Sequence, residues 1–321
     1  MDELTFESEA LRGNPLGDPY VRPLWVWTPP GYDPDGDRAY PTIYVLQGYT
    51  GELGMWRNRV AFRPSMPELL DRDAPECIVV FVDAWTSYGG SQFVDSAGSG
   101  RYHTYLCDEL VPFVDSRYRT SGRRGVAGKS SGGYGAAVTA MLRPDLFQGF
   151  ASHAGGGLFE VTIRPFFRVA ARALRDRYEG SVERFFDELR SGPAPLAHPD
   201  DIHVLLQWGF AAAYSADDDG TVRLPYDVAT AEVIPELWER WLEWDYPTLV
   251  PRHAAALREL RAIYLDAGSR DEWFVDFTME WMRRRLTELG VRDLHTELFD
   301  ATHGGIEYRY PLGIKYLVER L

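Results

Sequence analysis

The chain has 321 residues, of which 45% are hydrophobic, and it carries a formal net charge of −14. A chain of this size can bury a substantial core, and its acidity argues against nucleic acid and anionic membrane surfaces as partners. No apolar run approaches the roughly 18 residues of a membrane span, and the first residues lack the basic start and apolar core of a signal peptide. We therefore expect a soluble, cytoplasmic protein.

Predicted strands and helices alternate along most of the chain. Continuous apolar runs are typical of strands buried on both faces of a sheet, whereas apolar residues at helical spacing predict helices. In chain order we expect strands at Leu24–Trp27, Thr42–Leu46, Ile78–Val82, Arg123–Ala127, near Phe147–Phe150 and at Ala262–Leu265, with helices around Met66–Leu70, over Tyr105–Val114 and Tyr134–Met141, and after Tyr310. This alternation predicts an α/β layer structure with a mainly parallel sheet.

The most informative motif is GKSSGG at 128–133, a G-x-S-x-G sequence between an expected strand and an expected helix. In that context it is typical of a nucleophile elbow, a sharp turn that exposes a serine hydroxyl beside the first amides of the helix. Glycines at such a turn allow the strand and the helix to pack closely. We therefore predict that Ser130 is the nucleophile of a serine hydrolase.

The interval from about 158 to 247 breaks the alternation, because it contains long helical patterns such as Phe166–Tyr178 and Val182–Leu189. Helices inserted at this point would lie over the carboxyl edge of the sheet. We predict that this interval forms a helical cap over the active site.

A neutral serine needs a base, and the base needs a carboxylate that orients it. In chains with this elbow the acid and then the histidine follow the serine, and of the seven histidines only His253, His295 and His303 come late enough. His303 lies on a glycine-flanked loop between a strand-like segment and the last helix. His295 belongs to that strand-like segment, and His253 begins an alanine-rich helix. We predict His303 as the general base.

The acid should follow the strand that ends near Leu265. Three carboxylates are candidates there, Asp266, Asp271 and Glu272. Asp266 ends the strand and could simply cap the turn, whereas Asp271 lies beyond the turn and can reach the histidine loop. We favour Asp271, with Asp266 as the alternative.

Two backbone amides are expected to bind the oxyanion of the tetrahedral intermediate. One belongs to Ser131, the residue after the nucleophile. The other should come from the loop that follows the Thr42–Leu46 strand, where Gly48 gives the backbone freedom to turn the Tyr49 amide inward. A plain turn at the end of a strand is the alternative interpretation of this loop.

These motifs together resemble the "putative esterase" family of α/β-hydrolases, which includes esterase D, enterochelin esterase and the mycolyltransferases. The resemblance runs from LRGNPLGD at 11–18 and TPPGY at 28–32 to the G-x-x-D acid at 268–271 and His303, and it covers nearly all of the chain apart from the insert. It implies an α/β-hydrolase fold over 1–321 as a single domain, with a leading antiparallel β-layer. Relatives usually carry His-Gly and GHSMGG where this chain has Gln47-Gly48 and GKSSGG, which argues against S-formylglutathione hydrolase specifically.

The substrate is less well defined by sequence. Four residues near predicted strand ends are candidates for substrate binding, namely Gln47, Trp56, Trp85 and Trp273, and the three tryptophans suggest a small apolar or aromatic ester. We expect a carboxylic ester hydrolase that works through an acyl-serine. The alternatives are acyl transfer to an alcohol, a thioesterase of the S-formylglutathione hydrolase type, and a binding protein on a hydrolase fold.

A small-molecule ester is the only partner implied and a homo-oligomer is left open. No metal or organic cofactor is expected, and Cys77 and Cys107 are expected to be buried free thiols.

Overall fold

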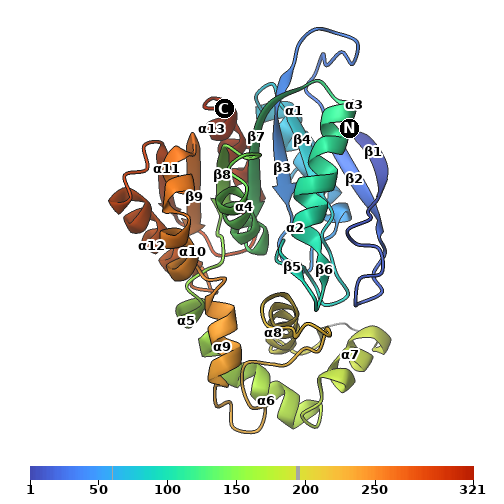
Figure 1. Cartoon of the computed structure of the whole chain (residues 1–321), viewed down its shortest axis with the longest axis vertical. Helices are drawn as coiled ribbons and strands as arrows, with labels where there is room; N and C mark the ends of the chain where they lie inside the picture. The colour runs from blue at the N-terminus through green and yellow to red at the C-terminus, as the bar shows by residue number, and fades with distance from the viewer. Residues whose placement is uncertain (60, 193–195) are drawn as a thin grey trace.

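The computed structural model of the chain describes residues 1–59, 61–192 and 196–321 (Figure 1). In this described part, the central sheet has eight strands in the order β1-β2-β4-β3-β7-β8-β9-β10. The strands β3, β4, β7, β8, β9 and β10 are mutually parallel, while β1 pairs with β2 and β2 with β4 in antiparallel register. Their bounds are β1 Asp2–Glu7, β2 Val21–Trp27, β3 Tyr40–Leu46, β4 Ile78–Val82, β7 Thr120–Lys129, β8 Gly149–His153, β9 Ala262–Gly268 and β10 Leu294–Phe299.

The apolar runs form strands because both faces of the sheet are covered. In β4 the side chains of Ile78, Val80 and Val82 join one hydrophobic core, while those of Val79 and Phe81 join the other. This is the two-residue alternation of a strand between two helical layers. The predicted mainly parallel sheet is therefore confirmed.

Helices cover the two faces of the sheet. The helices α1 Met66–Asp73 and α13 Tyr310–Val318 pack on the face that carries Val79 and Phe81. The helices α3 Val111–Arg117, α4 Ser131–Leu142 and α12 Val275–Glu288 pack on the other face, followed at its edge by α10 Tyr246–Arg252 and α11 Ala254–Glu259. None of the described helices is long and apolar enough to cross a lipid bilayer.

The helix expected over Tyr105–Val114 is interrupted. A short α2 (Tyr102–Thr104) leads into a π-helical segment, Tyr105–Leu110, before α3 begins. Pro112 has no amide hydrogen to donate to the Asp108 carbonyl, so the regular α-helical ladder cannot run through this point. A short hairpin, β5 Asp95–Ser96 and β6 Gly100–Arg101, precedes α2.

The interval assigned to a cap carries helices that lie beyond the carboxyl ends of the parallel strands (Figure 1). Residues 193–195 of that interval lie outside the described residues. Aromatic side chains form the core of this layer, with Phe167 of α6 in edge contact with the rings of Trp238 and Trp241 of α9. The helices are α5 Phe159–Thr162, α6 Phe167–Arg177, α7 Val182–Ser191, α8 Asp201–Tyr214 and α9 Pro235–Leu242.

One carboxylate joins the two ends of this insert. Buried Asp245 accepts hydrogen bonds from the amides of Phe159 at 2.7 Å and of Tyr246 at 2.8 Å. Beside it, Tyr134 of α4 donates its hydroxyl to the Trp244 carbonyl at 2.7 Å and stacks on Tyr246. The start and the end of the insert are therefore held together on the helix that begins at the elbow.

Candidate active site

Ser130 lies on the sharp turn between β7 and α4. Its backbone has φ 59° and ψ −123°, a conformation that residues with a side chain rarely adopt. The neighbouring glycines leave no room for a side chain. A Cβ on Gly128 would lie 2.2 Å from the Gly132 backbone, and one on Gly132 would lie 2.2 Å from the Leu46 carbonyl oxygen. The local geometry is therefore that of a nucleophile elbow, with the serine hydroxyl presented at the carboxyl edge of the sheet.

The structure brings Ser130, His303 and Asp271 together from three segments. His303 Nε2 lies 3.0 Å from Ser130 Oγ, and His303 Nδ1 lies 2.7 Å from Asp271 Oδ2. The Asp271 side chain is fully buried and its second oxygen accepts the Trp273 amide at 2.9 Å. This chain of contacts can pass a proton from the serine hydroxyl to the imidazole while the carboxylate fixes the imidazole tautomer.

The other two candidate acids have different partners. Glu272 accepts the backbone amide of His303 at 3.0 Å and so holds the loop rather than the ring. Asp266 lies inside β9, where His153 Nδ1 at 2.7 Å and Arg309 Nε at 2.8 Å contact its two oxygens. Burial alone would raise the pKa of the Asp266 carboxyl, but these two partners outweigh it and leave that pKa below its ordinary value.

The other late histidines are remote from this chemistry. His295 lies in β10 and stacks on the Tyr264 ring, and His253 stands between α10 and α11. Both positions are those expected from the sequence.

The loop after β3 lies against the elbow. A Cβ on Gly48 would stand 3.6 Å from Ser130 Cβ and 3.4 Å from the Lys129 carbonyl oxygen. The amides of Thr50 and Gly51 are already used, since they donate to the carbonyls of Gly89 and Gly48. Within the described residues, no oxygen accepts a hydrogen bond from the amide of Tyr49 or of Ser131. Both amides can therefore bind the carbonyl oxygen of a substrate that lies against Ser130.

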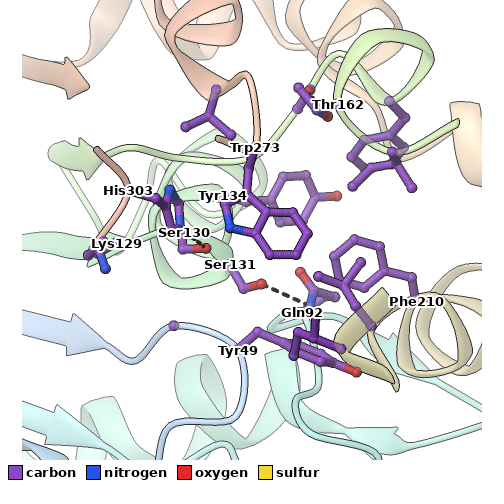
Figure 2. A pocket seen from close by; sticks show the side chains of 18 of the residues that line it. Tyr49, Gln92, Lys129, Ser130, Ser131, Tyr134, Thr162, Phe210, Trp273 and His303 are labelled. Atoms are coloured by element: carbon purple, nitrogen blue, oxygen red, sulfur yellow. Dashed lines mark hydrogen bonds between the residues drawn. The ribbon is translucent and has the colours of Figure 1, made fainter. Parts of the chain in front are cut away.

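A cavity of about 230 Å³ opens beside Ser130 and His303 (Figure 2). Its wall combines the elbow, the acid loop and the insert, and most of it is apolar or aromatic. Charged groups stand only where Lys129 and Glu307 face each other, with Nζ and Oε1 3.7 Å apart. The remaining wall includes Tyr49, Met55, Gln92, Tyr134, Phe159, Thr162, Ile163, Ile202, Leu206, Phe210, Tyr214, Trp273, Val275 and Tyr310.

Of the four predicted substrate-binding residues, only Trp273 lines this cavity, next to the His303 ring. Gln47 is buried directly after β3, where its side-chain amide, with oxygen and nitrogen exchanged to suit its neighbours, bonds to the backbone of Val82, Ala84 and Trp85. Trp56 packs on Phe81 in the hydrophobic core on the α1 side. Gln47, Trp56 and Trp85, which were predicted to bind substrate, therefore do not line this cavity.

Trp85 differs from Gln47 and Trp56 because its side chain is exposed rather than buried. It lies in a separate shallow groove with Arg22 and Asp83. A strand end fixes where a residue sits along the sheet, but the packing around it decides toward which side the side chain points.

The cavity wall also contains residues that sequence reasoning missed. Gln92 comes from the loop after β4, and Phe210 and Tyr214 come from α8. Gly89 and Gly90 mark that loop as a turn, but no local pattern singles out Gln92. Tyr49 was predicted only for its amide, yet its side chain also lines the cavity.

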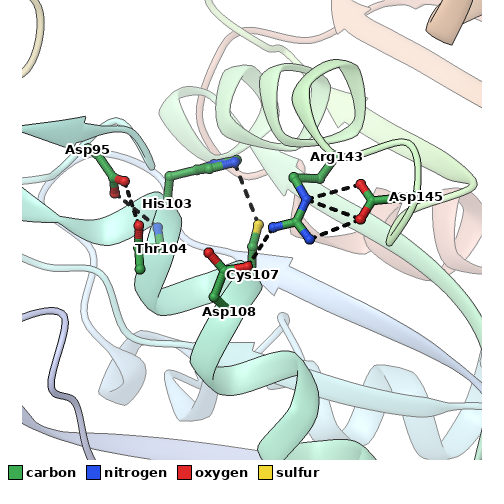
Figure 3. Close-up of polar contacts among 7 residues, drawn as sticks. All are labelled: Asp95, His103, Thr104, Cys107, Asp108, Arg143 and Asp145. Carbon is green, nitrogen blue, oxygen red and sulfur yellow. Dashed lines mark hydrogen bonds and ion pairs between the residues drawn. The ribbon is translucent and has the colours of Figure 1, made fainter.

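A second nucleophile–base pairing is visible where Cys107 Sγ lies 3.7 Å from His103 Nε2 (Figure 3). Burial raises the pKa of the Cys107 thiol to about 12 and lowers the pKa of the His103 imidazole, so both stay neutral. The pair packs next to the Arg143–Asp108 ion pair. Cys77 and Cys107 are both buried and free, as predicted.

No group of three or more His, Cys, Asp or Glu side chains suited to a metal ion is found among the described residues. The mainly parallel sheet with helices on both faces, and the strained serine between β7 and α4, define the class as an α/β-hydrolase. The chain belongs to the "putative esterase" family, whose model matches residues 22–303. It is therefore a carboxylic ester hydrolase by family.

Solved structures with the same fold include a ferulic acid esterase, with TM-score 0.61, 18% identity and coverage of 100% of this chain and 98% of that chain. A fluorophosphonate-binding serine hydrolase of Staphylococcus aureus has TM-score 0.59, 13% identity and coverage of 99% and 97%. An S-formylglutathione hydrolase from Agrobacterium tumefaciens has TM-score 0.56, 17% identity and coverage of 99% and 94%. At such identities the likeness supports the fold only.

Proposed function

We propose that this esterase hydrolyses small carboxylic esters with an apolar or aromatic acyl group, through an acyl-serine on Ser130. The observation that carries the proposal is the contact chain Ser130 Oγ–His303 Nε2–Asp271, at 3.0 Å and 2.7 Å, on a strained elbow that opens into a cavity. His303 is the base, Asp271 its orienting carboxylate, and the amides of Tyr49 and Ser131 are the oxyanion donors.

The reaction follows from these positions. His303 Nε2 takes the Ser130 proton as Oγ bonds to the ester carbonyl carbon, and the carbonyl oxygen becomes an oxyanion held by the two amides. When the intermediate collapses, the bond to the alcohol oxygen breaks and His303 returns the proton to that alcohol. Water then enters, gives a proton to His303 and attacks the acyl carbon. When this second intermediate collapses, the bond from the acyl carbon to Oγ breaks, His303 returns the proton to Ser130 Oγ, and the acid leaves.

The cavity supports the substrate class. Its volume of about 230 Å³ and its Phe159, Ile163, Phe210 and Val275 side chains suit a compact apolar group rather than a long chain. Aromatic rings from Tyr134 and Trp273 can stack on an aromatic acyl group. One structural neighbour bears the name ferulic acid esterase, which agrees with this class. The cytoplasmic location and the oligomeric state stay predictions.

Fluorophosphonate labelling and ester turnover test the proposal together. Wild-type protein should be labelled on Ser130 and should hydrolyse phenyl esters of short acids. Ser130→Ala should lose both properties, while Ser131→Ala, the matched control next to it, keeps its backbone amide and should still be labelled on Ser130. Label on Ser131, or an unlabelled and inactive wild type, would refute the assignment.

Product analysis tests hydrolysis against the transfer and thioester alternatives. With methanol added, free acid should remain the main product, because the proposal makes water the second nucleophile. Predominant methyl ester would instead identify an acyltransferase. A thioester cleaved much faster than its matched oxygen ester would identify a thioesterase.

A further inference from the structure

Gln92 and Ser131 form a polar spot on the wall of the cavity beside the elbow. Gln92 Nε2 donates to Ser131 Oγ at 3.2 Å (Figure 2). The Tyr214 hydroxyl donates to Gln92 Oε1 in a long contact of 3.4 Å. Gln92 is 2% exposed and Ser131 is 8% exposed. Buried polar groups of this kind need hydrogen-bond partners, so a polar spot in an apolar pocket indicates what the pocket is built to hold.

The other polar side chains of the inner wall are already occupied. Thr162 donates its hydroxyl to the Gly157 carbonyl at 2.7 Å, and Tyr134 donates to the Trp244 carbonyl at 2.7 Å. The Tyr49 hydroxyl bonds to the carbonyls of Tyr88 and Leu205. These three groups therefore have no hydroxyl hydrogen left for a ligand.

Gln92 and Ser131 can each form a further hydrogen bond. Ser131 Oγ accepts from Gln92, and no acceptor for its own hydrogen is found in the described part of the chain. The contact of Gln92 Oε1 with Tyr214 is long for an O–H···O hydrogen bond, so that oxygen can accept a better donor. The Ser131 hydroxyl hydrogen and a Gln92 oxygen that holds one long hydrogen bond lie side by side, and together they are the complement of a hydroxyl group.

The loop that carries Gln92 is held in a strained shape. Gln92 and Phe93 both have positive φ, 55° and 58°, a backbone conformation that residues with a side chain rarely adopt. Phe93 packs against α4 where Gly135 leaves room for it, since a Cβ on Gly135 would lie 2.3 Å from the Phe93 ring. The Phe93 amide is bonded to Ser91 Oγ at 3.2 Å. The packing of Phe93 thus fixes the Gln92 side chain at the cavity wall.

We propose that Gln92 and Ser131 form a hydroxyl-binding subsite, and that the preferred acyl group is a short apolar one with a hydroxyl near its ester carbonyl. The inference rests on the proposed function, because it places the acyl group in this cavity. Ser131 fixes the distance, since its amide binds the carbonyl oxygen while its side chain reaches the substituent. The hydroxyl therefore belongs on carbon 2 or carbon 3 of the acid.

The test compares phenyl esters of butanoic, 2-hydroxybutanoic and 3-hydroxybutanoic acid, with kcat/KM divided by the rate of hydroxide hydrolysis of each ester. Wild-type enzyme should prefer one hydroxy ester over the butanoate by about fivefold to tenfold, the size of one neutral hydrogen bond. Gln92→Met keeps the length of the side chain but removes its donor and acceptor, and it should abolish this preference. Ser131→Ala should also reduce it.

Thermal unfolding and the rate of fluorophosphonate labelling check that Gln92→Met leaves the fold and the nucleophile in place. Equal losses on all three esters would mean that Gln92 only supports the elbow, and would overturn the subsite. A wild type without preference among the three esters would overturn it too, while the proposed function stands. No turnover of any ester would overturn the proposed function itself, and the subsite with it.

Discussion

Exchanging Asp271 for asparagine should stop catalysis without unfolding the protein. In the wild type, Asp271 Oδ1 accepts the Trp273 amide at 2.9 Å and Oδ2 accepts His303 Nδ1–H at 2.7 Å. In Asp271→Asn the single oxygen can satisfy the Trp273 amide, which turns the new NH2 group toward His303 Nδ1. The imidazole must then carry its proton on Nε2, where it cannot accept the Ser130 proton. We expect kcat to fall by about 10⁴, or about 5.4 kcal/mol of barrier.

Asp266→Asn is the matched control, because Asp266 also pairs with a histidine but has no contact with Ser130. Its oxygens are used by His153 and Arg309, and both carboxylate and guanidinium are buried. Removing its charge takes one carboxylate from the buried Arg309 and leaves it Glu297, which should cost about 1–3 kcal/mol of unfolding free energy and less than about tenfold in kcat. Urea unfolding and steady-state turnover of a phenyl ester measure the two effects. A kinetic loss in Asp266→Asn equal to or above that in Asp271→Asn would refute the reasoning.

Two further predictions concern protonation. His303→Ala should abolish turnover, because it removes the base that accepts the Ser130 proton, whereas His295→Ala should keep activity. Steady-state turnover of a phenyl ester measures both, and an active His303→Ala would remove the proposed base. Burial raises the pKa of Asp245 to about 6, so its contribution to stability is present at low pH and is lost as pH rises from about 4 to 6. Across that window the unfolding free energy of the wild type should therefore fall by roughly 2–3 kcal/mol relative to that of Asp245→Asn. Unfolding free energies of the two proteins that change in parallel with pH would contradict this.

The elbow could be predicted because its requirements are local. Ser130 needs a strand before it, a helix after it and neighbours without side chains, and all of these are visible in the segment 120–142. The late acid and base were predictable for a related reason: parallel strands end at one edge of the sheet, so loops that follow β9 and β10 must meet near the loop that follows β7. The geometry agrees with the choice of Asp271 and His303.

The choice between Asp266 and Asp271 was harder from sequence, because both follow the same apolar run. In the structure the two differ in their position along the chain direction of the sheet. Asp266 still belongs to β9 and lies opposite His153 of β8, whereas Asp271 lies beyond the turn that follows β9. The turn at Gly268 that permits this is tight, since a Cβ there would lie 2.5 Å from the Ala301 carbonyl oxygen.

The sequence by itself therefore determined the α/β class, the elbow and the order of the three candidate catalytic residues, because each depends on short-range backbone geometry and on strand direction. Only the tertiary structure decided the cavity. Trp56 and Gln47 point into packed surroundings, while Gln92 and Phe210, more than a hundred positions apart in the chain, meet in one wall. Such contacts depend on how the insert packs over the sheet and on a strained loop held by distant neighbours, and no short stretch of sequence carries that information.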